Sequence, residues 1–143
     1  MTHKDLGNYA EKRKGVQLNE VIATKVREKT YNNRISCAEA HGIAMKLDAD
    51  PDEVGATIDL LEIHIIECQL GLFGQGDKNI PALTEKVDPD IDSAIKSSLY
   101  GGRLKCIDAW NIAKRFNIPK PLLTAICESM KIKISVCQLG TFR

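Results

Sequence analysis

The chain has 143 residues, with 20 basic and 19 acidic side chains and 43% hydrophobic residues. This composition is typical of a globular protein with one ordinary domain or two small ones, and it excludes collagen, coiled-coil rods and disordered chains. No stretch is apolar and long enough to span a membrane, and no secretory signal is recognisable at the N-terminus. We therefore expect a cytoplasmic protein with reduced cysteines.

The second half of the chain repeats the first at an offset of 69 residues, without a gap. Residues 18–73 align with residues 87–142, and 15 of the 56 aligned positions are identical, where average residue usage would give about 4. The clearest match ends each copy, where Cys68–Phe73 reads CQLGLF and Cys137–Phe142 reads CQLGTF. The predicted division is an N-terminal basic segment (1–17), a first repeat (18–73), a linker (74–86) and a second repeat (87–143).

Each repeat begins with a predicted amphipathic helix. Apolar residues at helical spacing indicate a helix over residues 19–31, and residues 88–100 have the same pattern, with Pro89 suited to the first helical position. Asn32–Asn33 and Gly101–Gly102 follow, and these residue types tolerate the left-handed backbone geometry that ends helices.

Two more helices, separated by a tight turn, follow in each repeat. The second helix is predicted over residues 36–47, where apolar residues form one stripe. The third begins at Pro51, with Asp50 placed to cap it and Glu53 at capping-box spacing. In the second repeat, residues 116–119 make the turn. The inner face of the helix that follows consists of Leu123, Ile126, Cys127 and Met130.

A short β-branched segment closes each repeat and predicts strands over residues 63–70 and 132–139. The glycine that follows each segment lets the chain turn, so we expect Phe73 and Phe142 to fold back onto the repeat that each of them ends. A recognition motif is the alternative interpretation of these two endings.

This order of elements resembles the helix-turn-helix units of winged-helix transcription regulators. The resemblance rests on Ile43–Leu47, Val54, Ile58, Leu61 and Ile63 in the first copy and on Ile112–Phe116, Ile118, Leu123, Cys127 and Met130 in the second. It covers residues 31–73 and 100–142, and it implies a mainly α-helical fold with short β-strands, built from two tandem winged-helix-like repeats. Modules of this kind bind DNA in some proteins and only other proteins in others.

Charge distinguishes the two repeats. Residues 34–73 have a net charge of −6, and residues 103–143 have a net charge of +6. Carboxylates at the start of the first copy's third helix would repel the phosphates beside a major groove, so the sequence predicts duplex DNA binding mainly by the second repeat. Binding is expected to be weakly specific, because no Arg, Asn or Gln begins its third helix. The predicted contact residues are Lys114, Arg115, Lys120, Thr124, Lys131 and Lys133.

Other roles stay open. The acidic first repeat is expected to serve dimerisation or contact with a protein partner, or to attract the basic repeat within one chain or between two. For the whole chain, the alternative to DNA binding is a protein–protein interaction adaptor of the same fold. The three histidines form no recognisable nucleophile–base–acid set, so neither an enzyme nor a cofactor is expected.

Four cysteines recur at equivalent positions in the two copies. They are Cys37, Cys68, Cys106 and Cys137. Core packing is the main expectation, because cysteine is among the most often buried residues. A thiol-based metal or redox sensor is the less favoured alternative, since the sequence has no Cys-x-x-Cys spacing.

Overall fold

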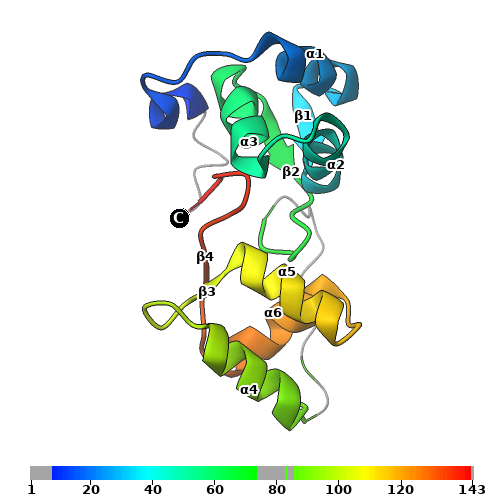
Figure 1. Cartoon of the computed structure of the whole chain (residues 1–143), viewed down its shortest axis with the longest axis vertical. Helices are drawn as coiled ribbons and strands as arrows, with labels where there is room; N and C mark the ends of the chain where they lie inside the picture. The colour runs from blue at the N-terminus through cyan, green and yellow to red at the C-terminus, as the bar shows by residue number, and fades with distance from the viewer. Residues whose placement is uncertain (1–7, 74–82, 84–85, 143) are drawn as a thin grey trace. The chain divides into compact units, whose positions relative to one another are not determined.

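The computed structural model describes residues 8–73, 83 and 86–142. The described residues form two compact units: unit 1 comprises those up to Cys68 together with Gln138–Phe142, and unit 2 comprises those from Gln69 to Cys137. Six α-helices, one 3₁₀-helix and four short strands are formed by the described residues (Figure 1). The expected mainly helical fold with short strands is confirmed. Among the described helices, none has the length and apolar character needed to cross a membrane.

Unit 1 is built from helices whose first turns are capped by side chains. Its elements are the 3₁₀-helix η2 (Tyr9–Arg13), α1 (Glu20–Lys29), β1 (Arg34–Ser36), α2 (Cys37–Leu47), α3 (Pro51–Leu60) and β2 (His64–Ile66). Asn19 caps α1, Ser36 and Glu39 form a capping box on α2, and Asp50 caps α3. Glu53 does not complete a box with Asp50, because its carboxylate accepts a hydrogen bond from the Asn19 side chain at 3.1 Å.

Unit 2 has the same order of elements as the corresponding part of unit 1. They are α4 (Pro89–Ser98), β3 (Leu104–Lys105), α5 (Cys106–Arg115), α6 (Lys120–Ser129) and β4 (Ile134–Ser135). Asp88 caps α4, and Pro89 occupies its first turn as predicted. Lys105 and Pro119, at the N-caps of α5 and α6, make no side-chain cap hydrogen bond.

The second and third helices of each unit meet at a short turn. Three residues connect α2 to α3 and four connect α5 to α6, which is the spacing of a helix-turn-helix. Asp48 and Asn117 end the preceding helix in the left-handed conformation, with φ of 52° and 53°. Ala44 and Ala113 are buried beside the turn, and their small side chains suit close helix packing.

Left-handed backbone positions recur at the offset of the sequence repeat. The pairs are Asn32 and Gly101, Asn33 and Gly102, Asp48 and Asn117, Glu62 and Lys131, Glu67 and Val136, and Gly71 and Gly140. Residues other than glycine rarely adopt positive φ, and a β-branched residue such as Val136 almost never does. The two copies therefore share one backbone path, including its least common conformations.

The strands are shorter than the sequence predicts. β1 pairs in parallel with β2, with Ser36 opposite Ile66, and β3 pairs in parallel with β4. The expected strands over residues 63–70 and 132–139 are confirmed only at His64–Ile66 and Ile134–Ser135 and are wrong elsewhere. The positive φ of the next residue, Glu67 or Val136, turns the chain out of the strand at both places.

The endings of the two repeats belong to the opposite units. Gln69–Phe73, which ends the first repeat, is part of unit 2, and Gln138–Phe142, which ends the second, is part of unit 1. The C-terminal segment accordingly comes back beside α3 (Figure 1). The expectation that Phe73 and Phe142 fold back onto their own repeats is wrong, and the repeat boundaries at residues 73 and 143 are not the boundaries of the compact units.

Each exchanged ending packs on the third helix of its unit at the same aligned position. In unit 2, the Thr124 hydroxyl of α6 donates to the Leu70 carbonyl at 2.8 Å. In unit 1, the aligned residue is Gly55 of α3, and a Cβ there would overlap the Leu139 carbonyl. Arg13 donates to that same carbonyl at 3.0 Å. Leu70 and Leu139 are both buried, so each ending contributes to the core of its unit.

Candidate nucleic-acid interface

The predicted cations of unit 2 lie at two ends of α6. Lys114 and Arg115 end α5 and Lys120 begins α6, so these three residues form what we call the turn-end group. Lys131 and Lys133 follow α6, and the Lys133 carbonyl accepts from the Leu104 N–H at 3.0 Å. That hydrogen bond places them beside β3. The strand-end group is therefore defined as Arg103, Lys105, Lys131 and Lys133.

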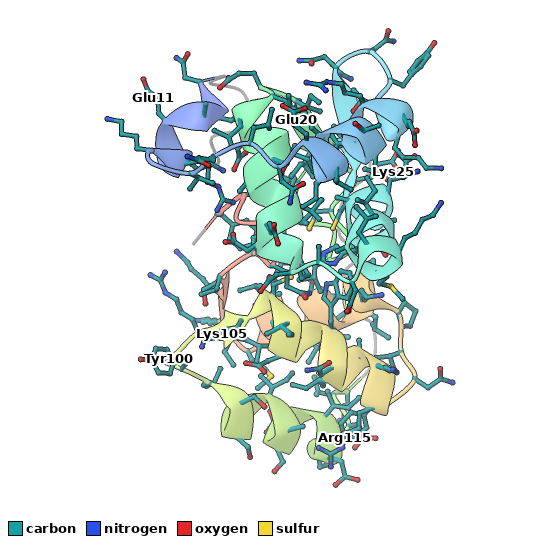
Figure 2. The ribbon with its side chains drawn as sticks, turned by 45° about the horizontal axis from the view of Figure 1, so that its top comes forward. Glu11, Glu20, Lys25, Tyr100, Lys105 and Arg115 are labelled. Carbon is teal, nitrogen blue, oxygen red and sulfur yellow. The ribbon has the colours of Figure 1, made fainter. Side chains whose placement is uncertain are left out.

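The two groups are separated by the length of α6. A helix of ten residues is about 15 Å long. Figure 2 shows Lys105 and Tyr100 together at one end of unit 2, with Arg115 at the other end. The structure thus does not gather the predicted contact residues into one cluster, and it adds Arg103 and Lys105 to the set.

Among the described residues, the cations of both groups have no carboxylate partner. In the described part of unit 2, the one ion pair joins Lys96 to Asp92 on α4, at 3.0 Å. Lys114, Arg115, Lys131 and Lys133 are exposed, and Lys120 is half-buried. An exposed cation without a carboxylate partner keeps its hydrogen-bond donors available for phosphate oxygens.

Aromatic rings position three of these cations. The Lys120 Nζ lies 4.5 Å from the centre of the Trp110 ring, the Lys105 Nζ lies 4.7 Å from the Tyr100 ring, and the Arg115 guanidinium lies 5.1 Å from the Phe116 ring. Cation–π contacts of this kind restrict the side chain without neutralising its charge.

Thr124 does not belong to the interface. Its side chain is buried, with 1% of its surface exposed, and its hydroxyl is engaged by the Leu70 carbonyl. The whole stretch Leu123–Cys127 is buried, so the middle of α6 has no face free to enter a groove. The prediction that Thr124 meets bases is therefore wrong, since it assumed that α6 exposes one side along its full length.

Three carboxylates of unit 1 are held by the N-terminal segment. Arg13 donates through Nε to Asp59 and through Nη1 to Asp52, both at 2.9 Å, and the Lys12 Nζ lies 3.1 Å from Asp59. Glu62 accepts from the backbone N–H groups of Tyr9 and Ala10 at 2.9 and 2.6 Å. These contacts fix η2 against α3.

Burial and pairing act in opposite directions in this cluster. Burial raises the pKa of Asp59, and the hydrogen bonds and charges of Arg13 and Lys12 only partly offset that effect. Burial by itself lowers the pKa of Arg13, but its hydrogen bonds to Asp59 and Asp52 leave that pKa above the ordinary value. The guanidinium therefore stays charged in its contact with both carboxylates.

Because of Arg13, part of the acidic surface expected to bind a partner is already occupied. Asp59 and Glu62 are covered by the N-terminal segment and Asp52 contacts it while staying exposed, whereas Asp48 and Glu67 are exposed and form no ion pair within the described residues. The role of Arg13 was not predicted. The available signal was the basic run Lys12–Lys14 in a chain whose next segment is strongly acidic.

The cysteines are free thiols, mostly within the core. Cys37, Cys68, Cys106 and Cys127 are buried, and Cys137 is half-buried. Burial, with a smaller contribution from the neighbouring Glu128, raises the pKa of Cys127 to about 11. Over the described residues, no three Cys, His, Asp or Glu side chains are grouped so that they could hold a metal ion.

Chemically, the interface of unit 2 offers fixed positive charge and many N–H donors at two separated places. Such a surface suits a polyanion with regularly spaced charges. No known family model, no curated protein and no solved structure matches this chain.

Proposed function

We propose that this protein is a non-enzymatic, cytoplasmic regulator built from tandem winged-helix-like units, which binds duplex DNA through the phosphate contacts of unit 2. One observation carries the proposal: the cations of the turn-end and strand-end groups have no carboxylate partner in the described part of unit 2. The phosphate backbone supplies most of the affinity of proteins for nucleic acid, and it needs such cations.

The separation of the two groups supports contacts on both sides of one groove. The length of α6, about 15 Å, is close to the width of the major groove, about 12 Å. Cations at both ends of α6 would then meet phosphates of the two strands, with the buried middle of the helix kept outside the groove. Phosphate contacts position a protein without reading sequence, so we expect weak sequence preference.

The burial of Leu123–Cys127 favours a second candidate, a protein–protein adaptor of the same fold. A third helix without an exposed central face lacks the usual surface for reading bases. In the adaptor, the same cations would face water or an acidic protein.

A titration of the full chain against duplex DNA separates the two candidates. We expect binding that weakens about a hundredfold or more between about 50 and 200 mM salt, as several phosphate contacts require. Arg115→Glu and Lys133→Glu, one from each group, should each weaken binding, whereas Lys46→Glu, the same charge reversal at an exposed position of unit 1, should not. Absence of binding at low salt would favour the adaptor.

The one tryptophan of the chain gives a second readout. Because the Lys120 Nζ lies over the Trp110 ring, DNA at the turn-end group should change the fluorescence of Trp110. A titration that shows binding by anisotropy but no change in Trp110 emission would restrict the interface to the strand-end group.

A further inference from the structure

The residues that the two repeats share lie mostly inside the protein. Thirteen of the fifteen identical pairs involve at least one buried or half-buried position, and core packing accounts for them. The two exceptions are Tyr31 with Tyr100 and Arg34 with Arg103, which are exposed in both units. No other aligned position that is exposed in both units carries the same residue.

The shared residues flank a tight hairpin turn. Tyr31 and Arg34 exchange backbone hydrogen bonds of 2.9 Å in both directions, and Tyr100 and Arg103 do the same at 2.8 and 3.1 Å. The two residues between them have positive φ in both units, as in a type I′ turn. The positive φ angles explain why Asn-Asn and Gly-Gly occupy the centres of the turns. The turn geometry does not require tyrosine and arginine at the flanking positions.

Both side chains of each turn are available to a partner. Tyr31 and Tyr100 expose 79% and 74% of their surface. Within the described residues, neither Arg34 nor Arg103 has a carboxylate partner. A large exposed tyrosine beside an unpaired arginine contributes nothing evident to the fold, and these two residue types are enriched where proteins bind partners.

The surroundings of each turn include further cations. In unit 1, Tyr31 and Arg34 line a shallow groove of about 510 Å³ together with Lys29 and Ser36. Glu39 and Glu67 also line it, but the Glu39 carboxylate is held by the Ser36 hydroxyl at 3.1 Å. In unit 2, Lys105 of the strand-end group lies over the Tyr100 ring, with its Nζ 4.7 Å from the ring centre.

At the turn of unit 1 the charges are balanced, because Lys29 and Arg34 line the groove together with Glu39 and Glu67. Glu62 is the carboxylate whose backbone contacts the turn, through a hydrogen bond of 3.0 Å from the Asn33 side chain to its carbonyl. Its carboxylate, however, accepts from the backbone of η2. The end of α1 carries the exposed cations Arg27 and Lys29, and Glu28 between them pairs with Lys25 at 3.5 Å.

We propose that the Tyr31–Arg34 and Tyr100–Arg103 turns are two equivalent phosphate contacts, so that unit 1 binds the same duplex DNA as unit 2. This inference rests on the proposed function and extends DNA binding to unit 1, which its net negative charge alone would exclude from contact with DNA. In each turn, the guanidinium donates to the oxygens of one phosphate and the tyrosine hydroxyl donates to the same backbone.

The test uses Arg34→Gln, Arg103→Gln and the double variant in the full chain, with a labelled duplex of about 20 base pairs, two helical turns. Each single variant should weaken binding by about threefold to tenfold and lower the slope of log affinity against log salt by about 1. The double variant should lower the slope by about 2, because the two sites share no residue. Lys46→Gln, an exposed lysine at the far end of α2, is the matched control and should leave the slope unchanged.

The outcomes distinguish the inference from the proposed function. If the wild-type chain binds and Arg103→Gln weakens binding while Arg34→Gln does not, the inference is overturned and DNA binding by unit 2 stands. If the wild-type chain does not bind duplex DNA, both fall. Far-UV circular dichroism of each variant establishes that the exposed substitutions leave the fold intact. Tyr31→Phe combined with Tyr100→Phe should reproduce part of the loss, since only the hydroxyls are removed.

Discussion

Units 1 and 2 share one backbone path, but the repeats from which they are built have net charges of opposite sign. In unit 1, Arg13 and Lys12 neutralise buried and exposed carboxylates of α3, and the result is a closed network within the unit. In unit 2, the aligned positions of Asp52 and Glu62 are Pro121 and Lys131, and the cations of the two groups have no carboxylate partner in the part of the unit that the structure describes. The net charge of unit 1 therefore overstates the acidic surface that a partner would meet, because several of its carboxylates are paired within the unit.

The same contrast holds where each exchanged ending meets its third helix. Unit 2 holds the Leu70 carbonyl with a hydroxyl of α6 itself, that of Thr124. Unit 1 has a glycine at that position and holds the Leu139 carbonyl with Arg13, a residue from outside the repeat. The equivalent carbonyls of the two units, those of Leu70 and Leu139, thus accept hydrogen bonds from unrelated side chains. Substitutions at these residues test how far the two units are equivalent.

The largest effect is expected at Arg13. Arg13→Gln removes the partner of buried Asp59 and the donor to Leu139, and it should lower the free energy of unfolding by about 3 kcal/mol. Urea unfolding followed by far-UV circular dichroism measures the change. Lys14→Gln, the same substitution at the exposed neighbouring residue, should have almost no effect. Equal losses for both variants would contradict the Arg13 network.

A smaller loss of stability is expected on substitution of Gly55, where the C-terminal segment packs against α3 of unit 1. Gly55→Ala places a Cβ against the Leu139 carbonyl and should cost about 2 kcal/mol of unfolding free energy through displaced backbone. Gly42→Ala, in α2, meets open space and should stabilise the chain by about 0.5–1 kcal/mol. If the two alanine variants changed stability in the same direction, the C-terminal ending would not pack on α3 as described.

In unit 2, the corresponding contact can be weakened without changing its shape. Thr124→Val removes the hydroxyl that binds the Leu70 carbonyl, and the expected loss is about 1–2 kcal/mol. Thr141→Val is the control, because the buried hydroxyl of Thr141 has no hydrogen-bond partner among the described residues. Thr141 belongs to unit 1 and Thr124 to unit 2, so thermal unfolding is followed by far-UV circular dichroism, which reports on both units. A neutral Thr124→Val would show that the exchange there does not depend on this hydrogen bond.

The smallest effect concerns thiol reactivity. With a pKa of about 11, Cys127 is ionised to only about one part in a thousand at pH 8, so it should alkylate far more slowly than the half-buried Cys137. Peptide mass analysis after brief iodoacetamide treatment gives the order of labelling. In urea, both thiols should react at similar rates. Early labelling of Cys127 in the native chain would contradict its burial.

Local features of this fold were predictable from the sequence because they depend on neighbouring residues. The repeat is visible in the printed letters, and the helix starts follow from Ser36, Asp50 and Pro89. The strand ends were not predictable, because glutamate and valine are not residue types that favour positive φ, yet Glu67 and Val136 adopt it.

The exchange of endings and the composition of the interface depend on tertiary contacts. Both copies carry the same Cys-Gln-Leu-Gly-x-Phe ending, so the sequence pattern cannot indicate which unit receives which copy. Thr124 was assigned to the interface from its place on a helical face, whereas Leu70, distant in sequence, covers it. Four of the five predicted contact lysines and arginines are exposed, as expected of long charged side chains, which are seldom buried.

The exchanged endings have a practical consequence for dissecting the protein. A fragment stopped at Phe73 would keep every residue of the first repeat and still leave Gly55 uncovered, because the peptide that packs there is supplied by residues 138–142. The last five residues of this fragment, Gln69–Phe73, would have nothing to pack against, because in the full chain they belong to unit 2. Half-molecules should therefore be designed by grafting Gln138–Phe142 in place of Gln69–Phe73, rather than by cutting at the repeat.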